Sequence, residues 1–169
     1  GVPAREMAGG AGAGGEPVIR DVLGAKGFDA ALRVGAVRDA CFGPMKDALV
    51  ASGLSTVALC GGRVVGVRFT LDWKDAAGPP PFPAELDEYR KMWKAKDDAW
   101  MASKGGLEAM GRGEYAHWVG IAVDGAFGRR GIATELYRRN VELLRKKGFK
   151  GAVAETASAF SEKAAEKNG

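Results

Sequence analysis

The chain has few of the residues that build metal sites and disulfides. Its 169 residues include one histidine, His117, and two cysteines, Cys41 and Cys60, with no Cys-x-x-Cys pair. This scarcity excludes the common zinc-binding patterns, and we expect no metal. The cysteines allow one disulfide, but two thiols in a reducing compartment are the simpler interpretation, so we expect a cytoplasmic protein. Long apolar runs are also absent: none approaches the roughly 18 residues of a membrane span, so we expect no membrane partner.

Acidic residues are sparse in one part of the chain. The formal net charge is +4, and residues 125–150 contain eight lysines or arginines and only two acids. Such a patch suits a polyanion, which is either a phosphorylated cofactor or a nucleic acid. Charge alone leaves both partners open.

Length and composition indicate one domain. The first fifteen residues are rich in glycine and alanine, and we expect a flexible tail over 1–15 and a single domain over 16–169. Residues 75–83 read DAAGPPPFP, a proline-rich linker that opens a helical insertion extending to residue 113. Because Asn168-Gly169 directly follows a helical pattern, we also expect that a C-terminal strand is missing from this sequence.

Hydrophobic periodicity predicts alternating strands and helices, as in an α/β or α+β fold. The expected strands cover residues 18–23, 55–60, 63–73, 115–123 and 151–156, and the expected helices cover 28–42, 45–51, 84–103, 131–147 and 159–167. Between the second and third strands, the dipeptide Gly61-Gly62 predicts a tight hairpin turn.

Residues 115–136 carry the strongest functional signal. They read YAHWVGIAVDGAFGRRGIATEL, an apolar strand followed by a glycine-containing turn and the start of an amphipathic helix. A helix N-terminus presents unpaired N–H groups and the positive end of the helix dipole, so it attracts phosphate. Arg129 and Arg130 add positive charge. We therefore predict a pyrophosphate-binding turn.

This strand, turn and helix resemble the coenzyme A site of GNAT-type N-acetyltransferases, whose Arg/Gln-x-x-Gly-x-Gly/Ala segment binds pyrophosphate through backbone amides. Gly131 and Ala133 occupy the small-residue positions, and Gly128 replaces the usual Arg or Gln. The resemblance covers residues 17–169 and implies a central mixed, mostly antiparallel twisted sheet flanked by helices. It implies acetyl-CoA as cofactor, bound by Ile121, Ala122, Val123, Gly128, Arg129, Arg130, Gly131, Ile132, Ala133, Thr134, Ser158 and Ser161.

The resemblance also implies a reaction, the transfer of an acetyl group from acetyl-CoA to a primary amine. The insertion at 75–113 is similar to that of arylalkylamine N-acetyltransferases, so a small arylalkylamine or polyamine-like acceptor is favoured. The alternatives are a protein or histone acceptor, a non-catalytic acyl-CoA-binding domain, and a basic nucleic-acid-binding module. For the enzyme we expect no nucleic acid partner, and a monomer or homodimer.

His117 is the candidate base, because vertebrate-type arylalkylamine enzymes carry a histidine at this distance from the turn and imidazole can accept the amine's proton. It stands six residues before Val123, which places both on one face of a continuous strand. Glu114 is a second candidate base, and Ser158 a candidate acid toward the thiolate. The alternatives are a structural histidine, a solvated glutamate and a helix-capping serine.

Two family residues have no counterpart here. Ala165 stands where many relatives carry a tyrosine that protonates the thiolate, and Phe42-Gly43-Pro44-Met45 replaces the insect-type Asp-Glu-Pro-Leu segment with its catalytic glutamate. These departures motivate the non-catalytic alternative. Phe42, Tyr89 and Trp93 are candidates for an acceptor-pocket wall, although aromatic residues at helical spacing also fit core packing.

Overall fold

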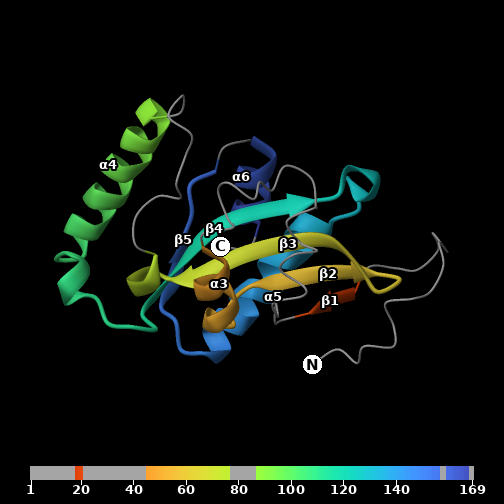
Figure 1. Cartoon of the computed structure of the whole chain (residues 1–169), viewed down its shortest axis with the longest axis horizontal. Coiled ribbons are helices and arrows are strands. Elements are labelled where there is room, and N and C mark those ends of the chain that lie inside the picture. Colours follow the sequence, from red (N-terminus) through yellow and green to blue (C-terminus); the bar gives the residue numbers. More distant parts are fainter. Residues whose placement is uncertain (1–17, 21–44, 77–86, 157–158, 168–169) are drawn as a thin grey trace.

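The computed structural model describes residues 18–20, 45–76, 87–156 and 159–167. Its strands form one twisted sheet in the order β1-β2-β3-β4-β5 (Figure 1). Neighbours are antiparallel from β1 to β4, and β5 runs parallel to β4. The strands are β1 (Val18–Arg20), β2 (Thr56–Cys60), β3 (Arg63–Asp72), β4 (Tyr115–Val123) and β5 (Gly151–Val153). This mixed, mostly antiparallel sheet confirms the expected fold class.

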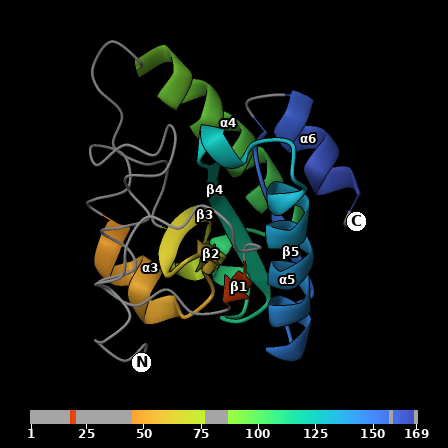
Figure 2. The same cartoon turned by 90° about the vertical axis from the view of Figure 1, so that its right-hand side faces the viewer.

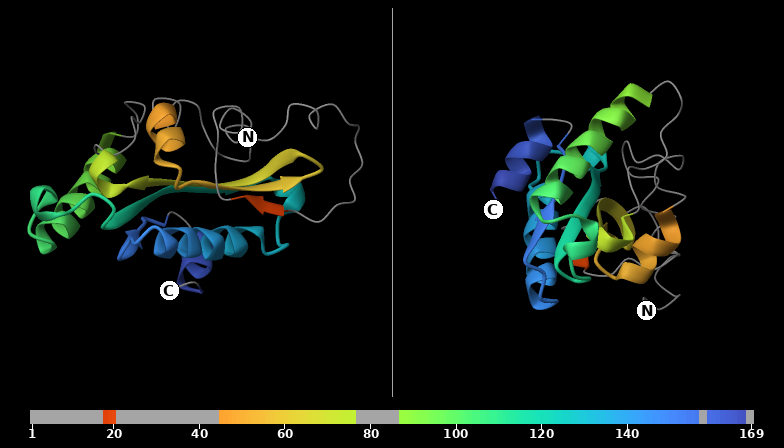
Figure 3. Two further views of the ribbon diagram at one scale, coloured as in Figure 1. Left: turned by 90° about the horizontal axis from the view of Figure 1, so that it is seen from below. Right: turned by 90° about the vertical axis from the view of Figure 1, so that its left-hand side faces the viewer.

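Helices cover both faces of the sheet. Helix α3 (Lys46–Ser52) lies on one face, and α5 (Ile132–Lys146) and α6 (Ala159–Glu166) lie on the other (Figure 3, left). Helix α4 (Asp87–Ser103) stands at the end of the sheet where β3 ends and β4 begins (Figures 1 and 2). No helix among the described residues has the length and apolarity needed to cross a membrane. The expected helix over 28–42 and most of the linker lie outside the described residues.

The β2–β3 hairpin forms as the sequence predicts. Gly61 and Gly62 have φ angles of 55° and 75°, both in the left-handed region that a type I′ turn requires and that glycine adopts without strain. Beyond the hairpin, Gly66 allows α5 to approach β3 closely. A Cβ at this position would lie 3.1 Å from Ile132 Cγ2 and 3.2 Å from Leu136 Cδ1. The missing side chain therefore fixes how closely the sheet and α5 pack.

A buried amide ties α5 to the sheet. The side chain of Asn140 is fully buried, and its Oδ1 accepts hydrogen bonds from Trp118 Nε1 at 2.7 Å and Thr70 Oγ1 at 3.1 Å. Its Nδ2 donates to the backbone oxygen of Leu54 at 2.7 Å. One side chain thus joins the helix to β3, to β4 and to the segment before β2.

An extra residue in β4 reverses which way its side chains face. Across the β3–β4 ladder, Gly120 pairs with Phe69 and Trp118 pairs with Thr70, which leaves Val119 as a bulge. Trp118 and Val123 both pack in the α5 layer although they are five residues apart. His117 therefore faces away from α5. The expectation that His117 and Val123 share a face was wrong, because one inserted residue shifts the two-residue alternation.

Candidate active site

The two parallel strands β4 and β5 separate after a short contact. Their pairing runs from Tyr115 with Gly151 to His117 with Val153, and β5 ends there. The expected strand over 151–156 was therefore too long by three residues, because the chain leaves β4 after Val153. From Trp118 to Val123, β4 pairs only with β3 among the described strands. We call this the open edge of β4, and the point where it begins, between His117 and Trp118, the divergence point.

The far end of the open edge leads into the turn before α5. A short 3-10 helix (Gly125–Phe127) is capped by Asp124, whose Oδ1 accepts from Ala126 N at 2.9 Å. Gly131 then takes a left-handed conformation with φ 77°, and α5 begins at Ile132. The first hydrogen bond of this helix runs from Glu135 N to Gly131 O at 2.9 Å, so the preceding amides are directed out of the helix end. The turn therefore presents the N–H groups that a pyrophosphate needs.

The two arginines of the turn lie on the surface. Arg129 and Arg130 are both exposed, and Arg129 adopts a left-handed φ of 59°, which is unusual for a residue with a Cβ. The guanidinium of Arg130 lies over the ring of Phe127, 5.2 Å from its centroid. Gly128 is exposed and Ala133 and Thr134 are half-buried, whereas Ile132 is buried against the sheet. Amides and cations thus gather at one helix end, as binding of a phosphorylated ligand requires.

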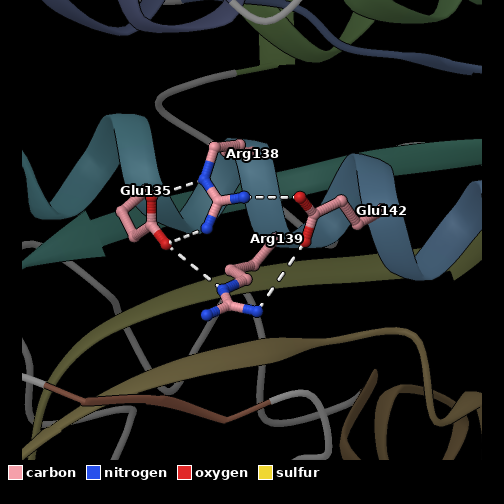
Figure 4. A network of polar contacts seen from close by, with 4 residues as sticks. All are labelled: Glu135, Arg138, Arg139 and Glu142. Atoms are coloured by element: carbon pink, nitrogen blue, oxygen red, sulfur yellow. Dashed lines mark hydrogen bonds and ion pairs between the residues drawn. The ribbon is translucent and has the colours of Figure 1, made fainter.

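The basic face of α5 carries its own counter-charges. Arg138 donates to Glu135 Oε2 at 2.7 Å and also contacts Glu142 (Figure 4). Arg139 lies 3.2 Å from Glu135 Oε1 and 3.7 Å from Glu142 Oε2. These pairs reduce the net positive charge that the helix offers, which weighs against the nucleic-acid alternative because that binding depends on unpaired cations.

His117 lies at the divergence point, on the face opposite α5. Its side chain is almost fully buried, and its Nε2 lies 3.4 Å from Glu155 Oε2. Its ring packs against that of Trp73 with centroids 4.6 Å apart. The other ring nitrogen, Nδ1, has no hydrogen-bond partner within the part of the chain that the structure describes. The imidazole is thus held by a carboxylate on one side and retains one nitrogen for another contact.

Two carboxyl groups near His117 shift each other's pKa in opposite directions. Burial raises the pKa of Asp97 on α4 to about 7, and the hydrogen bond and negative charge of Glu155 add to this shift. Burial opposes the ionisation of Glu155 as well, but hydrogen bonds from His117 and Asp97 lower its pKa to about 2. Between these pKa values Asp97 is protonated, and Glu155 keeps the negative charge that faces the imidazole.

This pair makes stability depend on pH. Between about pH 4 and pH 7 the folded state keeps a proton on Asp97 that the unfolded chain has lost, so stability falls as pH rises through this window. We expect Asp97→Asn to remove this fall, with a gain of about 2–4 kcal/mol at pH 7.5, since each pKa unit corresponds to about 1.4 kcal/mol. Urea unfolding at pH 5 and pH 7.5 measures the difference. The control is Asp98→Asn, at an exposed position one residue further along, and equal pH slopes in the two variants would contradict the assignment.

An aromatic cluster joins α4 to this site. The rings of Trp73 and Trp100 lie 4.5 Å apart, and Trp100 meets Tyr115 edge to face at 5.3 Å. Trp93 is half-buried one helical turn before Asp97. Of the other candidates for a pocket wall, Tyr89 lies on α4 with its side chain not described, and Phe42 lies outside the described residues.

The second candidate base, Glu114, pairs with other residues than His117. Glu114 Oε2 accepts from Gly111 N at 2.6 Å, and its other oxygen pairs with Lys150. The hydrogen bond from Lys150 lowers the pKa of Glu114, which makes it a weaker base. Ser158 lies outside the described residues, and Ser161 is half-buried on α6. No described group of three or more histidine, cysteine or acidic side chains is placed to hold a metal ion.

Sequence reasoning missed two residues that the structure brings to His117. Glu155 lies just beyond β5, and no local pattern distinguishes it from a solvated acid. Asp97 did carry a signal, because it falls between Trp93 and Trp100 at the same helical spacing. An acid on the apolar face of an otherwise amphipathic helix indicates a buried polar contact.

Comparisons with solved structures show what this fold resembles. Arylalkylamine N-acetyltransferase 2 from Aedes aegypti matches with a TM-score of 0.62 and 17% identity, covering 90% of this chain and 82% of that one. A Drosophila melanogaster polyamine N-acetyltransferase that forms N-acetylagmatine matches with a TM-score of 0.57 and 16% identity over 90% and 81%. The C-terminal condensation domain of Ebony, in complex with β-alanyl-dopamine, gives 0.58 and 17% over 90% and 80%.

Comparison of the sequence with family models identifies the group to which the chain belongs. No curated protein matched. The model of the acetyltransferase (GNAT) family matches residues 52–167, which include β2 to β5, the turn and both C-terminal helices. The chain therefore belongs to the acetyltransferase (GNAT) family and is by class an N-acetyltransferase.

Proposed function

We propose that this protein transfers the acetyl group of acetyl-CoA to the primary amine of a small molecule. The observation that carries the proposal is the buried chain of His117, Glu155 and Asp97 at the divergence point. The open edge of β4 connects this site to the turn before α5, a length of about 17 Å for the five steps between its six residues at about 3.3 Å each. The divergence point thus provides groups for proton transfer, and the turn before α5 provides groups for phosphate binding.

The residues of the open edge and the turn fit coenzyme A. The outward amides of the turn, with Arg129 and Arg130, would hold the pyrophosphate. The backbone of Ile121 and Val123, on the edge that no described strand covers, would pair with the pantetheine arm as an added strand does. The bound thioester supplies the activated acyl group, and much of the rate enhancement comes from proximity.

At the divergence point, His117 would take the proton from the attacking amine. An ammonium has no lone pair, so the amine must lose a proton before it can form a bond to carbon. Glu155, which stays ionised beside Nε2, stabilises the imidazolium that results. Asp97 holds the proton that keeps Glu155 in place. The chain therefore does not need the insect-type glutamate that is absent from its sequence.

The aromatic cluster favours a small acceptor that is cationic or aromatic. Trp73, Trp100 and Tyr115 form a chain of ring contacts that reaches His117 through Trp73, and Lys104 Nζ already lies 5.6 Å from the Tyr115 ring centroid. The similar structures include proteins named for arylalkylamines and for polyamines, which supports the same class. Assays with tryptamine and agmatine, measured by thiol release, compare the two.

Calorimetric titration with acetyl-CoA tests the cofactor site. We expect one-to-one micromolar binding, weakened about 10- to 100-fold by Arg129→Gln, because a charge-assisted hydrogen bond contributes about 1.5–3 kcal/mol. The matched control is Arg145→Gln, which removes the same charge from the last turn of α5 and should change the affinity less than about twofold. Equal losses would show that the turn is not the site, and no binding by the unaltered protein would overturn the proposed function.

A further inference from the structure

Arg68 is a charged side chain inside the core. It lies on β3 with 2% of its surface exposed, and its Nε and Nη2 are buried without a hydrogen-bond partner among the described residues. The guanidinium is stacked between two rings, 4.8 Å from the Trp118 centroid and 4.7 Å from the Tyr137 centroid. Ring stacking offsets only part of the cost of burying a cation. Because a buried cation with unpaired donors lowers the stability of the fold, Arg68 indicates a role other than stabilisation.

The position of the guanidinium is set by three elements. The backbone of Arg68 pairs with Ile121 of β4, yet its side chain reaches Trp118 of that strand and Tyr137 of α5. The side chain thus lies over β4 on the α5 face, and the charge of Glu155, just beyond β5, acts on it. Trp118 is the first residue of β4 beyond the last pair with β5, so the positive charge lies at the divergence point.

His117 and Arg68 therefore lie on opposite faces of the sheet at the divergence point. His117 and Trp118 are consecutive, so their side chains point to opposite faces, and Arg68 packs on Trp118. Burial lowers the pKa of Arg68 to about 10, a shift that Tyr137 and Glu155 oppose, and the group stays cationic at neutral pH. A base on one face and a fixed cation on the other suit a reaction that releases a proton and an anion.

We propose that Arg68 stabilises the thiolate that leaves when the acetyl group is transferred, an inference that rests on the proposed function. The amine nitrogen forms the C–N bond, the C–S bond breaks, and sulfur keeps the electron pair. His117 accepts the proton from nitrogen and later releases it to water, and the thiolate takes a proton from water, so the charges balance. The buried cation of Arg68 thus replaces the proton that a tyrosine provides in relatives, at a place where this chain has Ala165.

The test measures the ionisation of the bound thiol. Coenzyme A and desulfo-coenzyme A, which lacks the thiol, are titrated separately by calorimetry between pH 6 and pH 8.5. Dividing the two dissociation constants cancels the pH dependence that the protein contributes to binding of both ligands, because the same residues meet both. We expect the preference for coenzyme A to rise about fivefold over this range, if Arg68 lowers the thiol pKa by about one unit from about 8.5.

Variants test whether the preference for coenzyme A depends on the positive charge of Arg68. Arg68→Met should abolish the rise, and Arg68→Lys should keep part of it. The control Thr56→Val, on the β2 residue paired with Arg68, removes a buried hydroxyl that has no described partner and should leave the rise unchanged. If both ligands bind the unaltered protein with a constant ratio, the role of Arg68 is overturned and the proposed function stands, whatever the folding of the variants. If neither ligand binds, the proposed function itself fails.

Discussion

His117→Gln should lower kcat/KM for a basic amine by about 10²–10⁴-fold, the usual contribution of a positioned general base. Glutamine keeps a polar group near Glu155 and the packing against Trp73, but it cannot accept a proton at neutral pH. The dissociation constant for acetyl-CoA should stay within about twofold, because the turn and the open edge are unchanged. Steady-state kinetics together with calorimetry separate the two effects.

The choice of amine supplies the control for this variant. An aromatic amine such as aniline is already unprotonated at neutral pH, so it does not need a base before attack. We expect the loss caused by His117→Gln to be at least tenfold smaller for this amine than for tryptamine. A loss below about threefold for tryptamine would remove His117 from the mechanism and leave it as a buried structural side chain.

Asn140→Ala should destabilise the fold by about 3–5 kcal/mol. The substitution leaves the Trp118 N–H, the Thr70 hydroxyl and the Leu54 carbonyl without their shared partner, and it opens a cavity beneath the sheet. Each buried polar group left unsatisfied costs about 1–3 kcal/mol, and partial relaxation reduces the sum.

Urea unfolding measures this loss, and an unchanged m-value would show that the variant unfolds in the same transition. Thr70→Val is the matched control, since it removes one partner and leaves Asn140 bonded to Trp118 and Leu54, at a cost of about 1 kcal/mol. Similar losses in the two variants would mean that Asn140 does not join the three segments as described.

The sequence predicted the features that depend on local chemistry. The hairpin needed only two glycines in the left-handed region, and the turn before α5 needed small residues between an apolar strand and an amphipathic helix. Helix α3 lies within one residue of its expected bounds, because Gly53, which takes a left-handed conformation, ends it. Such elements are determined by residues close together in the sequence, so the sequence alone predicts them.

The features that build the site depend on contacts between distant residues. Nothing around Val119 marks it as a bulge, because the bulge arises from the pairing of β3 with β4. The mutual pKa shifts of Asp97 and Glu155 require α4 to meet the chain just beyond β5, and the two residues are 58 positions apart in the sequence. Arg68 interrupts an apolar strand, and nothing in the neighbouring sequence indicates that its side chain is buried between the rings of Trp118 and Tyr137.

The bulge at Val119 determines which changes in the length of β4 keep its side chains on their present faces. Deleting Val119 would remove the bulge and let β4 alternate regularly, with every other residue of the strand on its present face. Inserting a further residue while keeping only this bulge would instead bring His117 into the α5 layer or move Ile121 and Val123 out of it. The strand therefore keeps its side chains on their present faces when it loses the bulge residue, but not when it gains one.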